Sequence, residues 1–204
     1  MPMILRSSPT SPFARKARMA ILHLGLADKI ELVRADAMNP EDMLRRDNPL
    51  GKIPTLVTTD GKAIYDSRVI LEYLDHMAGG GIIIPDAWPA RLGVLTTQAM
   101  CDGIMDACVL IVYEARHRPE TIRHPPWLDY QRGKVVRALT AFAKQTPDPA
   151  HFNVGTLTAA CMLGYLDLRK HVDWRNDFAT LVPWLDAFRA KHPEYDATVP
   201  PESA

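Results

Sequence analysis

A hydroxyl-rich segment near the start of the sequence contains the first residues that could do chemistry. Ser8, Thr10 and Ser11 precede Pro12, and the Ser11-Pro12 pair is typical of a helix that begins at Pro12 with Ser11 as its N-cap. The first amides of a helix and the positive end of its dipole favour an anion. A hydroxyl there could donate to a thiolate and lower the pKa of the thiol. The alternative is that Ser11 only caps the helix.

Two later segments could present polar groups to a ligand. In the segment 48–54 (NPLGKIP), Pro54 is expected to open a strand, because proline lacks an amide hydrogen for the sheet. A cis Ile53–Pro54 bond would leave the N–H and C=O of Ile53 open to an extended ligand, whereas a trans bond would mark an ordinary strand start. Asp66 and Ser67 begin a predicted helix, where amides and a hydroxyl could bind a carboxylate or Asp66 could simply act as a cap.

Hydrophobic periodicity predicts an α/β layer over residues 1–78 that positions these segments. The predicted strands cover residues 3–5, 30–33, 53–58 and 62–65, and the predicted helices cover residues 12–24, 40–46 and 67–77. This βαβ–ββα order allows the three polar segments to converge at one edge of the sheet.

The spacing of apolar residues in the rest of the chain is typical of helices. Residues 79–89 hold three glycines and two prolines and are predicted to be a linker. Helices are predicted at about 90–116, 126–144, 154–171 and 181–191, with no strand. The expected organisation is an α/β domain over 1–78, the linker 79–89 and an all-helical domain over 90–204.

Composition and cysteine usage exclude several classes. With 24 Lys+Arg against 24 Asp+Glu and 47% hydrophobic residues, the chain has neither the composition of a disordered protein nor the basic charge typical of a nucleic-acid binder. No apolar run approaches about 18 residues, so we expect no signal peptide or membrane helix, and a cytoplasmic location. Cys101, Cys108 and Cys161 form no CxxC pair, so we expect buried core thiols and no metal site.

The motifs together resemble those of the cytosolic glutathione S-transferases. The matching segments are 8–18 (SPTSPFARKAR), 48–56 (NPLGKIPTL), 66–73 (DSRVILEY) and 164–169 (GYLDLR), and the resemblance covers essentially the whole chain. The first loop and the segment 102–107 (DGIMDA) are similar to the bacterial branch of YibF-like proteins. The resemblance implies a thioredoxin-like domain followed by a helical bundle, a homodimer, and glutathione as co-substrate for attack on a hydrophobic electrophile.

The resemblance also implies roles for individual residues. Ser11 is expected to activate the glutathione thiol, with Thr10 as the second choice; Ser8 matches by offset the cysteine position of another class. Residues implied to bind glutathione are Ser8, Phe13, Lys52, Ile53, cis-Pro54, Asp66, Ser67 and Asp102. Of these, Ile53 would pair with the cysteinyl unit, Asp66 and Ser67 would hold the γ-glutamyl end, and Lys52 would reach the glycyl carboxylate.

In the helical domain, the resemblance places Asp102 across a dimer interface and Tyr113 in the electrophile pocket. A solvated or helix-paired aspartate and an ordinary half-buried tyrosine are the alternatives.

Three other functions stay open. A non-catalytic interaction protein resembling the stringent starvation proteins would not need the motifs at Ile53-Pro54 and Asp66-Ser67. An isomerase of the zeta type would carry a cysteine and a tryptophan in the first loop, and residues 8–18 contain neither. Serine at position 11 removes a mixed-disulfide reductase mechanism but leaves a glutathione peroxidase possible.

Overall fold

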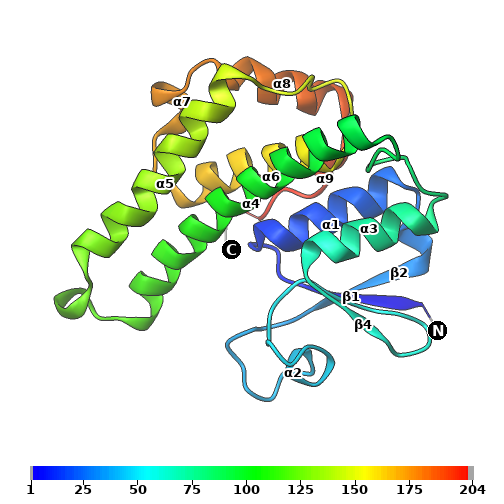
Figure 1. Ribbon diagram of the computed structural model, residues 1–204. Helices are drawn as coiled ribbons and strands as arrows, with labels where there is room; N and C mark the ends of the chain where they lie inside the picture. Colours follow the sequence, from blue (N-terminus) through cyan, green and yellow to red (C-terminus); the bar gives the residue numbers. More distant parts are fainter. Residues whose placement is uncertain (1, 202–204) are drawn as a thin grey trace. The chain divides into compact units, whose positions relative to one another are not determined.

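The computed structural model describes residues 2–201 and has the expected fold class, a mixed α/β unit and a largely helical unit (Figure 1). Among the described residues, the α/β unit holds residues 2–91 together with residues 193–201, and the helical unit spans Leu92–His192. The sequence predicts that residues 193–204 belong to the helical domain. The described part of this segment, 193–201, groups instead with the α/β unit, where the side chain of Arg15 binds Tyr195 and Thr198.

A four-stranded sheet forms the centre of the α/β unit. Its strands are β1 (Met3–Ser7), β2 (Ile30–Arg34), β3 (Thr55–Val57) and β4 (Ala63–Ile64), in the spatial order β2-β1-β3-β4. β1 pairs in parallel with β2, β3 is antiparallel to β1, and β4 is antiparallel to β3. The sheet is therefore mixed, as the βαβ–ββα order predicts.

Two amphipathic helices, α1 (Pro12–His23) and α3 (Ser67–Met77), pack together on one face of this sheet (Figure 1). Each buries its apolar stripe, including Ala17 and Ile21 of α1 and Leu74 of α3. The short α2 (Leu44–Asp47) begins later than its predicted start at residue 40.

The late start of α2 has a local cause. The carboxylate of Asp42 accepts hydrogen bonds from the amides of Asp36 and Leu44, both at 2.8 Å, and thereby holds residues 36–43 in turns.

A buried arginine fastens the segment after Pro193 to α1. Arg15 is 3% exposed, and its Nη2 donates to the carbonyl of Tyr195 at 2.9 Å. Its Nε donates to Thr198 Oγ1 at 3.3 Å, and its Cζ lies 4.1 Å from the centroid of the Tyr195 ring. Tyr195 belongs to the single-turn helix α9 (Glu194–Ala197). The contacts with Arg15 therefore hold α9 against α1, far away in the sequence.

The chain after α3 is organised by one carboxylate. Asp75 is 5% exposed and accepts hydrogen bonds from the amides of Gly81, Ile82 and Ile83 at 2.9, 3.0 and 2.7 Å. Gly81 has a φ of 74°, a conformation that favours glycine, and a Cβ atom there would lie 2.9 Å from Asp86. The predicted linker is thus a fixed turn.

The helical unit is built around α6 (Val154–Arg169), which buries residues on all its sides. Asn153 caps this helix by accepting from the amides of Gly155 and Thr156, and Thr156 Oγ1 accepts from the amide of Asn153 at 3.0 Å. The other helices are α4 (Trp88–His117), α5 (Pro125–Lys144), α7 (Trp174–Asp177) and α8 (Leu181–Lys191).

Among the described residues, α4 is long and apolar enough to cross a membrane, judged only by length and composition. In the folded chain 44% of this apolar window is buried, and core helices of globular proteins also meet these two criteria. The sequence predicts no membrane helix, because no uninterrupted apolar run approaches about 18 residues.

Candidate functional site

The sheet topology brings the three polar segments to one end of the sheet. The loop 8–11 follows the carboxyl end of β1, and Arg6 of β1 pairs with Thr55, the first residue of β3. Ile53 and Pro54 directly precede this residue. β4 is antiparallel to β3, so its carboxyl end, which leads into Asp66, lies at the same end of the sheet.

The hydroxyls of the first loop are linked to one another and to α1. Ser8 Oγ and Thr10 Oγ1 lie 3.3 Å apart, and the amide of Ser11 donates to the carbonyl of Ser8 at 3.2 Å. Ser11 is the N-cap of α1, and its Oγ accepts from the amide of Ala14 at 3.2 Å. Ser11 therefore acts as the cap that its position predicts. Its hydroxyl hydrogen stays available to another acceptor, because the amide of Ala14 uses only a lone pair of the Ser11 oxygen.

The Ile53–Pro54 peptide bond is cis, as the resemblance implies. Within the described residues, the main-chain N–H and C=O of Ile53 have no hydrogen bond. The preceding loop is held by Asn48, which is 1% exposed and whose Nδ2 donates to the carbonyl of Lys52 at 3.0 Å and to Thr55 Oγ1 at 3.1 Å. The Lys52 side chain is exposed beside this loop.

Asp66 and Ser67 lie at the start of α3, and the Tyr65–Asp66 peptide bond is also cis. Asp66 is the N-cap: its Oδ1 accepts from the amide of Arg68 at 3.0 Å, and its Oδ2 pairs with the Arg68 guanidinium at 2.9 Å. Partial burial raises the pKa of Asp66. Hydrogen bonds from Arg68 and the charges of Arg68 and Lys16 outweigh this effect, so the net shift of that pKa is downward. Asp66 is thus an anion at neutral pH.

Lys16 is a polar residue of this site that the sequence analysis missed. Its side chain is fully buried, and its Nζ donates to Ser67 Oγ at 3.3 Å. A signal was available in the sequence, since Lys16 is three residues from Phe13 and four from Ala20, on the apolar stripe of α1. Ser67 is itself 3% exposed, so the bond joins two buried groups on neighbouring helices.

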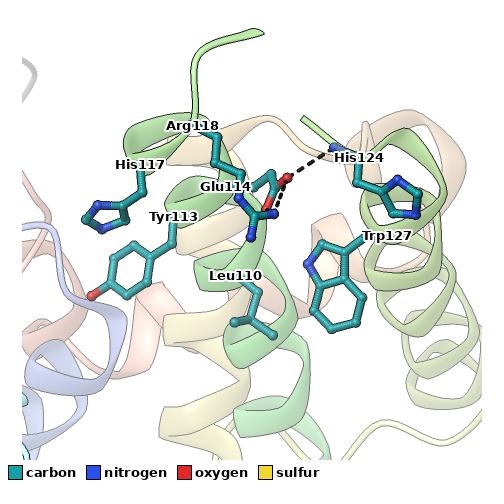
Figure 2. A pocket seen from close by; sticks show the side chains of 7 residues that line it. All are labelled: Leu110, Tyr113, Glu114, His117, Arg118, His124 and Trp127. Atoms are coloured by element: carbon teal, nitrogen blue, oxygen red, sulfur yellow. Dashed lines mark hydrogen bonds and ion pairs between the residues drawn. The ribbon is translucent and has the colours of Figure 1, made fainter. Parts of the chain in front are cut away.

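In the helical unit, Tyr113 lies on the wall of a cavity of about 540 Å³ between the end of α4 and the start of α5 (Figure 2). Tyr113 is 40% exposed, and its ring meets the His117 ring edge-on at a centroid distance of 5.5 Å. The lining residues are Leu110, Tyr113, Glu114, His117, Arg118, His124 and Trp127. The cavity therefore combines apolar and aromatic walls with a few polar groups, which is usual for a small-molecule site.

One ion pair orders the polar side of this cavity. Glu114 accepts hydrogen bonds from Arg118 Nη1 at 2.9 and 2.7 Å and from the main-chain amide of His124 at 3.1 Å (Figure 2). The bonds from Arg118 and His124 hold the pKa of Glu114 below its ordinary value. Glu114 thereby ties the end of α4 to the start of α5.

The remaining predicted residues lie apart from this cavity. Asp102 is 5% exposed in the helical unit, so it is not a solvated surface aspartate, and its role across a dimer stays a prediction. All three cysteines are buried, which confirms that they are core thiols. Burial raises the pKa of the Cys108 thiol to about 12, so this residue is a poor nucleophile at neutral pH.

Comparison with known proteins agrees with this architecture. Residues 10–77 match the family of glutathione S-transferase amino-terminal domains. The uncharacterized GST-like protein YibF of Escherichia coli K12 is 32% identical over 206 aligned positions, covering 98% of this chain and 100% of YibF. A glutathione transferase family member from Pseudomonas fluorescens Pf-5, solved with bound glutathione, superposes with a TM-score of 0.91 at 38% identity over 98% of this chain and 99% of that one.

A shorter match extends to a different kind of protein. A stringent starvation protein A homolog from Coxiella burnetii is 34% identical over 74 residues, which cover 36% of this chain and 34% of that protein. The full-length match to YibF and the glutathione-bound structural relative together decide the family. The chain belongs to the glutathione S-transferases.

Proposed function

We propose that this protein is a glutathione transferase, in which Ser11 stabilises the thiolate of glutathione for attack on an electrophilic small molecule. One observation carries the proposal. Ser11 Oγ accepts the amide of Ala14 at the start of α1, so its hydroxyl hydrogen is available to a sulfur atom. Ser11 lies at the end of the sheet where the main chain of Ile53 and the side chain of Ser67 also lie.

The chemistry is thiolate activation followed by nucleophilic attack. A cysteine thiol has an ordinary pKa of about 8.5, so it is mostly protonated at neutral pH. A hydrogen bond from Ser11 and the dipole of α1 would lower that pKa by about one to two units, or about 1.4–2.7 kcal/mol of thiolate stabilisation. The thiolate then forms a carbon–sulfur bond, and the leaving group departs with its electron pair. Thr10 is the alternative donor, and Ser8 contacts Thr10.

Glutathione itself would be held by main chain and short side chains. The open N–H and C=O of Ile53 beside cis-Pro54 suit pairing with the cysteinyl unit. Asp66 can accept from the γ-glutamyl ammonium, because its lowered pKa keeps it charged, and Ser67 with the first amides of α3 can bind the neighbouring carboxylate. Lys52 is exposed and could reach the glycyl carboxylate. Phe13 would contact the ligand from the first turn of α1.

The electrophile is assigned to the helical unit. The cavity lined by Tyr113 and Trp127 offers apolar and aromatic surface to a hydrophobic substrate. A homodimer, a contact from Asp102 across it, a cytoplasmic location and a role in detoxification complete the proposal. These last parts rest on the family.

Calorimetric titration with glutathione and a panel of co-substrates test the proposal. The panel holds a chlorinated aromatic, a hydroperoxide and a disulfide. We expect glutathione to bind and the chlorinated aromatic to be conjugated. Ser67→Ala should weaken glutathione binding about tenfold, whereas Thr58→Ala, in the β3–β4 hairpin, should leave it unchanged. Turnover of the hydroperoxide alone would convert the assignment to a peroxidase.

A non-catalytic interaction protein is the second candidate. The match to the stringent starvation protein A homolog, which covers 36% of this chain, supports it. A dissociation constant for glutathione weaker than ~10 mM, together with no turnover of any co-substrate, would favour this function.

A further inference from the structure

The cavity between the end of α4 and the start of α5 combines aromatic surface with an ion pair (Figure 2). Leu110 is 40%, Tyr113 40% and Trp127 38% exposed, so all three offer apolar surface to a ligand. Arg118 and Glu114 line the same cavity, and in the view of Figure 2 the guanidinium lies between Tyr113 and Trp127. A ligand that fills the cavity therefore meets this ion pair, which decides the polar group that the ligand must carry.

Glu114 has little acceptor capacity left for a ligand. It is the one acidic residue among the described residues that line the cavity. Both of its carboxylate oxygens accept from Arg118 Nη1, at 2.9 and 2.7 Å, and Oε1 also accepts from the amide of His124 at 3.1 Å. Its side chain is only 6% exposed. Glu114 therefore acts mainly by fixing one side of the Arg118 guanidinium.

The guanidinium of Arg118 keeps its other edge open. Nη1 is bound to Glu114, whereas Nε and Nη2 have no hydrogen bond among the described residues, and 51% of the side chain is exposed. The N–H groups of Nε and Nη2 point in parallel, and this fork matches the two oxygens of a carboxylate. The ion pair with Glu114 thus leaves free the edge that can bind a carboxylate with two hydrogen bonds.

The other polar side chains of the lining can donate as well. The indole N–H of Trp127 and the hydroxyl of Tyr113 have no hydrogen bond within the described part of the chain. The imidazoles of His117 and His124 each carry an N–H in either tautomer. The open hydrogen-bonding groups are thus mainly donors, and the guanidinium adds a positive charge. This combination favours an anionic acceptor.

A neutral group would fit this edge less well. A ligand that covers Nε and Nη2 removes water from both, and each donor then needs an acceptor from the ligand. A carboxylate supplies two oxygens and a compensating charge. A carboxamide of nearly the same size supplies one oxygen, and its NH₂ group would face the second donor. The edge therefore discriminates between two groups of similar shape.

We propose that Arg118 makes this cavity selective for electrophiles that carry a carboxylate, which its open Nε–Nη2 edge binds while Tyr113 and Trp127 contact the apolar part of the molecule. This inference rests on the proposed function, because it takes the cavity as the electrophile site. It narrows the substrate class from hydrophobic electrophiles to acidic ones. Arg118 is thereby a specificity-determining residue and has no part in activating the thiol.

Two electrophiles that differ in one group test the inference, 4-chloro-3-nitrobenzoate and 4-chloro-3-nitrobenzamide. In both, the thiolate of glutathione forms a carbon–sulfur bond at the carbon that bears chlorine, and chloride leaves with the electron pair. Each kcat/KM is divided by the uncatalysed rate constant, because the two groups activate the ring to different extents. We expect the wild type to prefer the benzoate about tenfold, and Arg118→Met to lower that ratio to about one.

The matched control is Arg137→Met, which removes an exposed arginine of α5 that does not line the cavity. It should leave the ratio as in the wild type. Arg118→Met also leaves the Glu114 carboxylate unpaired, and this charge would repel an acidic ligand. The comparison is therefore repeated in a Glu114→Gln background, where Arg118→Met should still abolish the preference. Arg118→Lys keeps the charge without the fork and should retain part of the preference; it replaces Arg118→Met if that variant does not fold.

Binding of the two glutathione conjugates gives a measurement that does not depend on turnover. Calorimetric titration with the carboxylate and the carboxamide conjugate should show the same preference of about tenfold in the wild type and its loss in Arg118→Met. Preference for the carboxylate conjugate without turnover of either electrophile would support the inference, although the proposed catalysis would fail.

The remaining outcomes separate the inference from the proposed function. If the wild type binds neither glutathione nor the conjugates, the proposed function fails and the inference with it. If the wild type binds glutathione but treats the carboxylate and the carboxamide alike, or if Arg118→Met keeps the preference, the inference alone is overturned. Equal losses for both groups in Arg118→Met would assign Arg118 only a structural role as the partner of Glu114, which also overturns the inference.

Discussion

Ser11 Oγ accepts the amide of Ala14 at 3.2 Å, so one hydroxyl both caps α1 and, in the proposed mechanism, faces the thiol of glutathione. The two roles use different parts of the group, a lone pair for the cap and the hydrogen for the sulfur. They can therefore be separated by substitution.

Ser11→Ala removes both roles. We expect it to lower the free energy of unfolding by about 1 kcal/mol, the usual cost of losing an N-cap. It should also raise the pKa of the bound thiol by about one unit, because the hydrogen bond is lost while the dipole of α1 remains. The thiolate absorbance of the glutathione complex, titrated against pH, measures the second effect. Ser11→Asp restores the cap but places a negative charge beside the sulfur, so it should regain stability while raising the thiol pKa further. An unchanged thiol pKa in Ser11→Ala would move the catalytic role to Thr10.

Asp75 binds three consecutive amides of the segment after α3. Asp75→Ala leaves the buried amide of Ile83 and its two neighbours without their acceptor, and we expect it to lower the free energy of unfolding by about 3 kcal/mol. Asp28→Ala, which removes an exposed carboxylate, is the control and should change that energy by less than about 0.5 kcal/mol. Urea denaturation followed by circular dichroism measures both. Equal effects of the two substitutions would show that the turn does not depend on Asp75.

Glu114 should make the stability of the protein depend on acidic pH. Its pKa in the folded state is lowered from 4.5 by Arg118 and the His124 amide. A carboxyl group with a lowered pKa contributes stability above its unfolded pKa and loses that contribution as the pH falls through the folded value. Glu114→Gln should therefore destabilise the protein at pH 7 and less at about pH 3, because the contribution of the carboxylate declines as the pH falls below the unfolded pKa. Urea midpoints at the two pH values test this, and a pH-independent difference would contradict it.

The cysteines should be inert in the native protein. Burial raises the pKa of Cys108 to about 12, and Cys101 and Cys161 are also buried. We expect no reaction with a chromogenic disulfide reagent at pH 8 on a time scale of minutes, and release of three equivalents after denaturation, one for each cysteine in the sequence. Fast reaction of the folded protein would show that one thiol is accessible. Cys108→Ala should keep transferase activity.

Local sequence predicts the helix starts well because the caps act over a few residues. Ser11, Asp66 and Asn153 each cap the helix that follows, as expected from residue type and position. The hairpin was predicted too long: β3 begins at Thr55, since Ile53 and Pro54 stand outside the ladder. The three site segments could be predicted to converge, because strand order alone brings them to one end of the sheet.

What the sequence could not supply depends on distant contacts. Helix α7 is a single turn, and its Trp174 donates to Asp167 at 2.8 Å. So short a helix has no periodicity to detect. The place of Lys16 on the apolar stripe of α1 indicates that it is buried, but its bond to Ser67 depends on the packing of α3 against α1 and cannot be read from the sequence.

The bond between Arg15 and Tyr195 has a consequence for the order of events during synthesis. The α/β unit draws on both early and late parts of the chain, since the guanidinium of Arg15 is buried against residues near 195. Domains commonly fold as they leave the ribosome, first segment first. This unit cannot complete its core before the rest of the chain is made. The partners of Arg15 lie in residues 193–198, which are synthesised only after the helical unit. The α/β unit is therefore expected to be the last part of the protein to finish folding.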